Sequence, residues 1–191
     1  GWDQYGFPDY VLDDKTDISA DILTFIDEVL PESNVDLSQF PEIQNQQLDD
    51  LKIVHDGSLI ATAVFEGAGW KNSLGFYRYD SESPECPTGT NALEILFPNF
   101  SLNENGSKLE PGHSIEIGPV TAGDYLGFFL ISKGWKDQTV KPGLYTHYTN
   151  TSWNPESDAA KRAHTLLLYD DVSDALIVAM EDVSRESEES D

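Results

Sequence analysis

The chain has 191 residues and a formal net charge of −24, because 35 acidic side chains face only 11 lysines and arginines. A charge of this sign repels phosphates, which argues against nucleic-acid binding and against adsorption to an anionic membrane. It suits a solvated surface, a hydrophilic arm, or carboxylate clusters that hold a hard cation such as Ca²⁺.

The first fifty residues form the most acidic part of the sequence. Residues 1–50 carry thirteen acidic side chains and a single cation, Lys15, which predicts an acidic N-terminal arm. Within it, apolar residues recur at three-to-four spacing, and we expect one amphipathic helix at about 17–30. Asp17 is the expected N-cap, and Pro31 stops the run. One apolar helix face must be covered, so the arm is expected to pack on the rest of the chain.

From Leu51 onward the sequence has the pattern of short strands. Two strands are expected on either side of a turn at 55–57. Others are expected at 73–80, 92–98, 113–120, 124–135, 163–171 and 175–181. Short strands without helices between them are typical of an antiparallel β-sandwich. The sequence therefore predicts a mainly β chain: a jelly-roll-like antiparallel β-sandwich over 51–191, with one N-terminal amphipathic helix.

Glycines and aromatic residues are interleaved over residues 65–80. Glycine permits positive φ and close approach of the backbone. One interpretation is a glycine-bulged hairpin whose aromatic side chains fill the core. Another is a tight turn at a strand end, where the side-chain oxygens of Glu66 and Asn72 are available to a cation. The two interpretations are compatible.

Residues 136–163 form a long polar and aromatic segment. Long loops on rigid scaffolds often carry recognition, and aromatic side chains stack on sugars or peptides. The predicted ligand-binding residues are Tyr145, His147, Tyr148 and Trp153. The alternative is a loop that its aromatic residues hold over an open core.

Signals for enzymatic chemistry are weak. The sequence has no nucleophile elbow, no phosphate-binding glycine loop and no zincin helix. His55, His113, His147 and His164 lie far apart without metal-ligand spacing, so no histidine metal centre is predicted, and His164 is interpreted as a packed or capping residue. The single cysteine, Cys86, excludes an internal disulfide and is interpreted as an incidental thiol. We predict that the chain is not an enzyme.

Seven segments, read in order, resemble one family. They are LPES (30–33), FEGAGWKNSLGFYRY (65–79), ILFPNFS (95–101), LEPGHSIEIG (109–118), AGDYLGFFLISKGW (122–135), HTLLLYDD (164–171) and AMEDV (179–183). Together they resemble the bacterial DUF4114 domain over roughly residues 20–183. That domain occurs in RTX-type adhesins and other calcium-rich surface proteins. The resemblance implies a β-sandwich, an extracellular setting and bound Ca²⁺, through which some similar modules grip peptide ends or other surface ligands.

The resemblance also implies a calcium site near the C-terminal end of the sequence. The glutamate–aspartate pair of the family matches Glu181 and Asp182, and its later acidic motif would begin at Asp191, where the sequence stops. Asp170 and Asp171 end the preceding strand and would join the site if the hairpin register allows it. A last strand missing after Asp191 is expected to leave an unpaired sheet edge that favours self-association.

The predicted function is a calcium-dependent extracellular module that binds a peptide or glycan on another surface. No apolar run approaches the roughly 18 residues of a membrane span, so no membrane insertion is expected. One alternative is a structural subunit of a filament or surface layer, joined by strand or arm exchange. A carbohydrate-active hydrolase is the remote alternative. For residues 184–191, a solvated acidic tail is the alternative to a role in the calcium site.

Overall fold

The computed structural model describes residues 1–29, 50–64, 67, 69–80, 85–87, 93–101, 106–170 and 175–186. In these residues the chain is mainly β, and all of the strand pairs are antiparallel. This confirms the prediction of a mainly β chain with antiparallel strands. The finer prediction of a jelly-roll-like sandwich stays a prediction.

The predicted N-terminal helix is present and shorter than expected. Helix α1 (Ala20–Val29) begins after Ser19, whose Oγ accepts a hydrogen bond from the Ile22 backbone N–H at 3.2 Å. Ser19 therefore takes the capping role that was expected of Asp17. The helix buries Ile26. Within the described residues, no helix combines the length and the apolar character that crossing a membrane requires.

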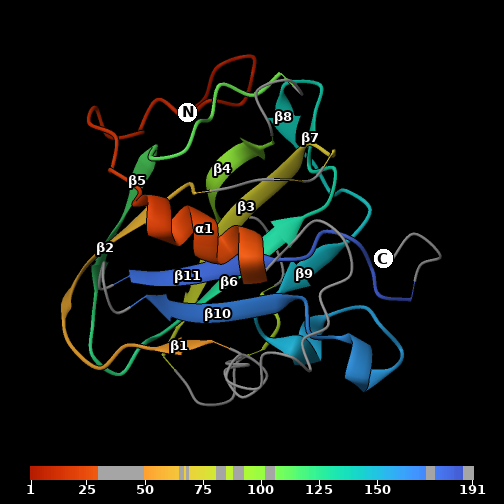
Figure 1. The fold of residues 1–191 in the computed structure, drawn as a ribbon. Helices are drawn as coiled ribbons and strands as arrows, with labels where there is room; N and C mark the ends of the chain where they lie inside the picture. The colour runs from red at the N-terminus through yellow and green to blue at the C-terminus, as the bar shows by residue number, and fades with distance from the viewer. Residues whose placement is uncertain are drawn as a thin grey trace.

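The largest sheet has five strands and is built around β3 and β6 (Figure 1). Its order is β1 (Leu51–Lys52), β6 (Tyr125–Ile131), β3 (Asn72–Tyr79) and β4 (Glu94–Phe100), and β9 (Thr146–Tyr148) also pairs with β6. β1 pairs with the first residues of β6 and β9 with the last, so these two short strands share one edge of β6. The nearly continuous apolar sequence of β6 agrees with its burial, because every residue after Tyr125 is buried on whichever face of the sheet it lies.

Three further strand pairs complete the described β structure. They are β2 (Gly57–Thr62) with β5 (Ser114–Val120), β7 (Trp135–Lys136) with β8 (Thr139–Val140), and β10 (Thr165–Asp170) with β11 (Ala175–Met180). The expected strands on either side of residues 55–57 are therefore present as β1 and β2, but they pair with β6 and β5 and not with each other. The segment between them is held by the turn before β6, where the Ile53 N–H donates to the Asp124 carbonyl at 2.8 Å.

The predicted strand at 124–135 is divided in the structure into β6 and β7. Lys133 has a φ of 56°, which ends the extended run. A two-residue turn follows β7, with positive φ at both Asp137 and Gln138, as a type I′ hairpin requires. The Ser132 N–H then donates to the Tyr145 carbonyl at 3.0 Å. This closure returns the chain to β6 as β9, so part of the expected loop at 136–163 is sheet.

The main core lies among β3, β4, β5 and β6, with partly buried residues of β2 and β11 packed against it. Its buried members are Ala63, Phe76, Leu96, Phe97, Ile115, Ile117, Leu126 and Phe128. A Cβ at Gly75 would lie 2.3 Å from the Glu94 carbonyl oxygen, and the β3–β4 register shifts between Leu74 and Gly75. The described part of the glycine–aromatic stretch thus forms a bulged, core-filling strand, which agrees with the first interpretation.

The start of the acidic arm contacts the β structure directly. Val11 forms an isolated bridge with Ile115 of β5, and the Thr16 N–H donates to the Gly112 carbonyl at 2.8 Å. The Tyr10 hydroxyl lies 3.1 Å from the Ile95 carbonyl, to which it donates a hydrogen bond. Backbone pairing, in addition to apolar contact, therefore fixes this part of the arm.

Candidate functional site

Two of the predicted calcium-site residues, far apart in the sequence, meet in the structure. The Asn72 amide, at the start of β3, donates a hydrogen bond to Asp182 Oδ2 at 2.7 Å, and both side chains are buried. The Lys133 N–H donates to Asn72 Oδ1 at 3.0 Å, which fixes the orientation of the amide. In this orientation Asn72 presents its nitrogen to Asp182. Its expected role as an oxygen ligand is therefore replaced by that of a residue that positions Asp182.

Asp182 is a carboxylate removed from solvent. Burial raises the pKa of Asp182, and the nearby Glu181 adds to this effect, whereas the hydrogen bond from Asn72 and the charge of Lys133 oppose it. The net shift is upward, so these partners do not fully replace the water that the carboxylate loses. The segment is also anchored through its backbone, because the Ser132 hydroxyl donates to the Asp182 carbonyl.

Glu181 lies next to Asp182 and is exposed. Its Oε1 accepts hydrogen bonds from the backbone N–H groups of Asp182 at 3.0 Å and Val183 at 3.2 Å. The Glu181 N–H donates to the His164 carbonyl at 2.8 Å, which continues the β10–β11 pairing by one residue. One buried and one exposed carboxylate thus stand side by side where β11 ends.

The hairpin register separates Asp170 from this pair. β10 and β11 run antiparallel with Asp170 opposite Ala175 and Thr165 opposite Met180. Asp170 is therefore at the turn end of the hairpin, while Glu181 and Asp182 follow the other end, about 20 Å away at 3.3 Å per residue. One calcium site that includes all three is incompatible with this register. Glu66, Asp171 and Asp191 lie outside the described residues.

The predicted aromatic ligand surface is largely part of the packed interior. His147 is fully buried, which excludes the expected contact with a surface ligand. Tyr148 and Trp153 pack against the cluster of Tyr77 and Phe129, with the Tyr77 and Trp153 ring centroids 5.3 Å apart. The physical reason is the pairing of β9 with β6, which makes part of the supposed loop a strand of the sheet. Consecutive strand residues point to opposite faces, so His147 and Tyr148 pack against different sets of side chains. Tyr145 is half-buried.

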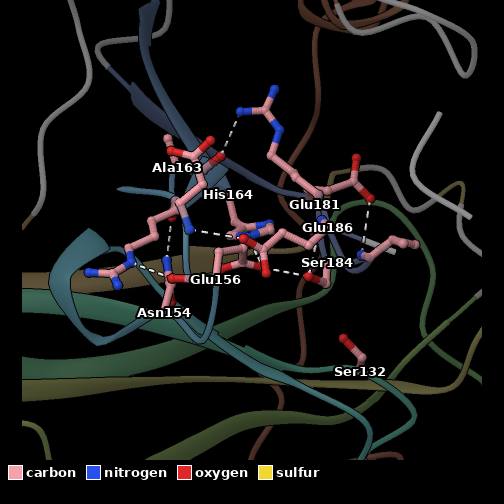
Figure 2. Close-up of polar contacts among 12 residues, drawn as sticks. Ser132, Asn154, Glu156, Ala163, His164, Glu181, Ser184 and Glu186 are labelled. Atoms are coloured by element: carbon pink, nitrogen blue, oxygen red, sulfur yellow. Dashed lines mark hydrogen bonds and ion pairs between the residues drawn. The ribbon is translucent and has the colours of Figure 1, made fainter. Parts of the chain in front are cut away.

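His147 belongs to a cluster that the sequence analysis did not predict. His147 of β9, Glu156 of the following loop and His164, just before β10, are all buried, and one ligand atom of each lies within 4.8 Å of the others. The His164 Nε2 lies 3.0 Å from Glu156 Oε1, and the two imidazole rings stack with centroids 3.8 Å apart. Figure 2 shows Glu156 and His164 pointing toward each other, with Ser184 on the far side of the carboxylate.

The spacing of these three residues in the sequence does not predict the cluster, because sheet pairing and an irregular loop bring its members together. Burial lowers the pKa of His147 to about 4, and the neighbouring His164 adds to this effect while Glu156 opposes it. Burial also lowers the pKa of His164. Burial works to raise the pKa of Glu156, but the hydrogen bond from Ser184 and the nearby His164 help to bring it below its ordinary value. The cluster thus holds two neutral imidazoles and one carboxylate near neutral pH.

Comparison with known proteins identifies one family. Residues 120–191 match the family model DUF4114, described as a domain of unknown function. The match spans β6 to β11, and it includes Asp182 and the three members of the buried cluster. No curated protein and no solved structure matches the chain. The C-terminal region of the chain is therefore similar to the DUF4114 family.

Proposed function

We propose that the chain is a non-enzymatic, calcium-dependent binding module of an extracellular protein, and that it recognises a peptide or glycan on another surface. The resemblance to calcium-rich adhesin modules supports the setting. The observation that carries the proposal is the buried carboxylate of Asp182, beside the exposed Glu181, in a chain of net charge −24. Burial removes water from the Asp182 carboxylate, and a cation at this position would stabilise its negative charge in place of that water.

The oxygen donors at the end of β11 suit Ca²⁺. Asp182 and Glu181 supply hard carboxylate oxygens, which calcium prefers, and Asn72 holds the Asp182 side chain in place. Asp182 already connects the end of β11 to the β3–β6 sheet, because it accepts hydrogen bonds from Asn72 of β3 and from Ser132, which follows β6. A bound Ca²⁺ would strengthen this connection. Since His147 is buried and Tyr148 and Trp153 are partly buried by packing against Tyr77 and Phe129, this proposal assigns ligand contact to the ion and to the exposed Glu181. There, a carboxylate or hydroxyl oxygen of the ligand would complete the calcium shell.

The proposal predicts that Ca²⁺ raises the thermal stability of the chain. With Ca²⁺ at about 100 times its Kd, binding stabilises the folded state by roughly 2.7 kcal/mol, which for a chain of this length is about 5–10 °C in Tm. The measurement is a thermal melt in chelator, then in millimolar Ca²⁺, with Mg²⁺ as the ion control. A Tm that does not change with Ca²⁺ would contradict the proposal.

Asp182→Asn is the informative variant, because asparagine keeps the shape and an oxygen that accepts from Asn72. We expect this variant to melt in chelator at or above the wild-type Tm, since a buried charge has been removed, and to lose the response to Ca²⁺. Asp14→Asn is the matched control, because it removes an exposed carboxylate from the N-terminal segment. This control should keep the full calcium response. An equal response in both variants would place the ion elsewhere.

A further inference from the structure

The cluster of His147, Glu156 and His164 concentrates polar atoms that lack partners. Six buried side-chain nitrogen and oxygen atoms of the described residues have no hydrogen-bond partner, and five of them belong to these three residues. They include both ring nitrogens of His147 and Oε2 of Glu156. The His164 Nε2 is close to Glu156 Oε1 but is not aligned with it as a hydrogen bond. Buried polar groups are nearly always paired, so this concentration calls for a physical explanation.

We propose that His147, Glu156 and His164 form a buried binding site for a divalent transition-metal ion of the Zn²⁺ class. An ion bound by one nitrogen of each imidazole and one oxygen of Glu156 would satisfy a ligand atom on all three side chains at once. Metal ligation requires neutral imidazoles and an ionised carboxylate. Burial favours the neutral imidazoles, while the hydrogen bond from Ser184 and the nearby His164 favour the ionised form of Glu156. The site is separate from the calcium proposal and does not depend on it.

The donor set selects the class of ion. Two imidazole nitrogens and one carboxylate oxygen match the ligands of Zn²⁺ and of ferrous iron, whereas Ca²⁺ and Mg²⁺ prefer a shell made of oxygens. Around a tetrahedral Zn²⁺ with ligand bonds of about 2.1 Å, neighbouring donor atoms are separated by about 3.4 Å. The three donors here lie within 4.8 Å of one another. To bind one ion they would have to move closer, and the stacked imidazole rings would have to turn so that one nitrogen of each faces the ion. Water or a backbone oxygen would fill a fourth position.

The loop that carries Glu156 is fixed by contacts on both sides. The buried Asn154 accepts from the Tyr148 N–H at 2.6 Å, and its amide donates to the Tyr148 carbonyl at 2.9 Å and to the Arg162 carbonyl at 2.7 Å. The Arg162 side chain donates to the Glu156 carbonyl at 2.6 Å. The loop therefore holds Glu156 opposite His164 with little freedom, as a metal site requires of its supporting residues.

The segment after β11 closes the site from the other side. The Ser184 hydroxyl donates to Glu156 Oε1 at 2.7 Å, and the Arg185 guanidinium donates to the Ala163 carbonyl at 3.2 Å (Figure 2). Glu186 accepts from the Ser157 hydroxyl at 2.7 Å. A metal ion here would tie β9, the Glu156 loop and β10 together beneath this segment. Because all three ligands are buried, we assign the ion a structural role rather than a catalytic one.

The test is a zinc titration of the full 191-residue chain without a polyhistidine tag, in competition with a chromophoric chelator. Millimolar Ca²⁺ is present throughout, so that exposed carboxylates are occupied. We expect one Zn²⁺ per chain, and an affinity that falls at least about 100-fold in His147→Gln and in His164→Gln. His55→Gln is the matched control, because His55 is exposed and distant in sequence, and it should bind as the wild type does. Absence of one-to-one binding, or equal affinity in His147→Gln, would overturn the proposal.

Two further measurements guard against a variant that fails to fold. Glu156→Gln keeps the side-chain shape and an acceptor for Ser184, so it should remain folded and bind Zn²⁺ at least about 10-fold more weakly. Co²⁺ added to the wild-type chain should give the intense visible absorption of a four-coordinate ion with nitrogen ligands. A weak, octahedral-type Co²⁺ spectrum in the wild-type chain would indicate surface carboxylates as ligands and would refute the site.

Discussion

Gly127→Ala is expected to lower the free energy of unfolding by roughly 3 kcal/mol, one of the largest effects available from adding a single methyl group. A Cβ at position 127 would lie 2.1 Å from Cζ of Tyr77 and 2.3 Å from its hydroxyl oxygen. The Tyr77 ring cannot move aside cheaply, because its hydroxyl donates to Asp50 at 2.7 Å and lies 3.0 Å from the Thr149 hydroxyl. Overpacking and the lost buried hydrogen bonds both contribute to the loss.

Chemical denaturation or a thermal melt measures this effect, and 3 kcal/mol corresponds to a fall of about 6–12 °C in Tm for a chain of this length. Gly57→Ala is the matched control. Gly57 opens β2, is exposed, and a Cβ there would meet nothing within 4 Å. Its stability should stay within about 1 kcal/mol of the wild type. If Gly127→Ala had the same Tm as the wild type, the close packing of Tyr77 against Gly127 of β6 would be contradicted.

The second large effect is a loss of stability in acid that comes from His147. In the unfolded chain a histidine has a pKa of about 6.5, whereas burial lowers the pKa of His147 in the folded chain to about 4. The unfolded state therefore takes up a proton first. The stabilising contribution is fully present above pH 6.5 and is lost as the pH falls toward 4. At about 1.4 kcal/mol per pH unit, the loss is about 3 kcal/mol.

The measurement compares the free energy of unfolding of the wild type and of His147→Gln at several pH values, with chelator present. Acid also neutralises many carboxylates, which relieves repulsion in a chain of charge −24 and stabilises both proteins. The diagnostic quantity is therefore the difference between the two proteins. We expect the wild type to lose up to about 3 kcal/mol of stability relative to the variant as the pH is lowered from 6.5 to 4. A difference that is constant with pH would refute a buried, neutral His147.

The positions of the strands could be predicted because strand alternation is a local property. β5, β10 and β11 each fall within a predicted range, α1 does as well, and β3 is offset from its predicted range by one residue. The choice of strand partners could not be predicted in the same way. β1 and β2 lie on either side of a turn signal, yet each pairs with a distant strand, because the turn before β6 captures the segment between them. That outcome depends on contacts between residues more than fifty positions apart in the sequence.

The candidate sites show the same limit. The glycine–aromatic stretch singled out Asn72 and the family resemblance singled out Asp182, but only the fold brings them to 2.7 Å and shows that the asparagine donates. His147 was predicted to face a ligand because its segment is polar and aromatic. A three-residue pairing with β6 buries it instead. No sequence pattern pointed to Glu156. Its partners are His147 in β9, His164 just before β10 and Ser184 after β11, and these segments meet only in the folded chain.

Calorimetric titration of Ca²⁺ into the chelator-stripped chain, with Mg²⁺ in the buffer, tests the central claim most directly. The account predicts saturable binding in the wild type and in Asp14→Asn, and loss of that binding in Asp182→Asn. A flat titration of the wild type, or the same isotherm for Asp182→Asn, would contradict it.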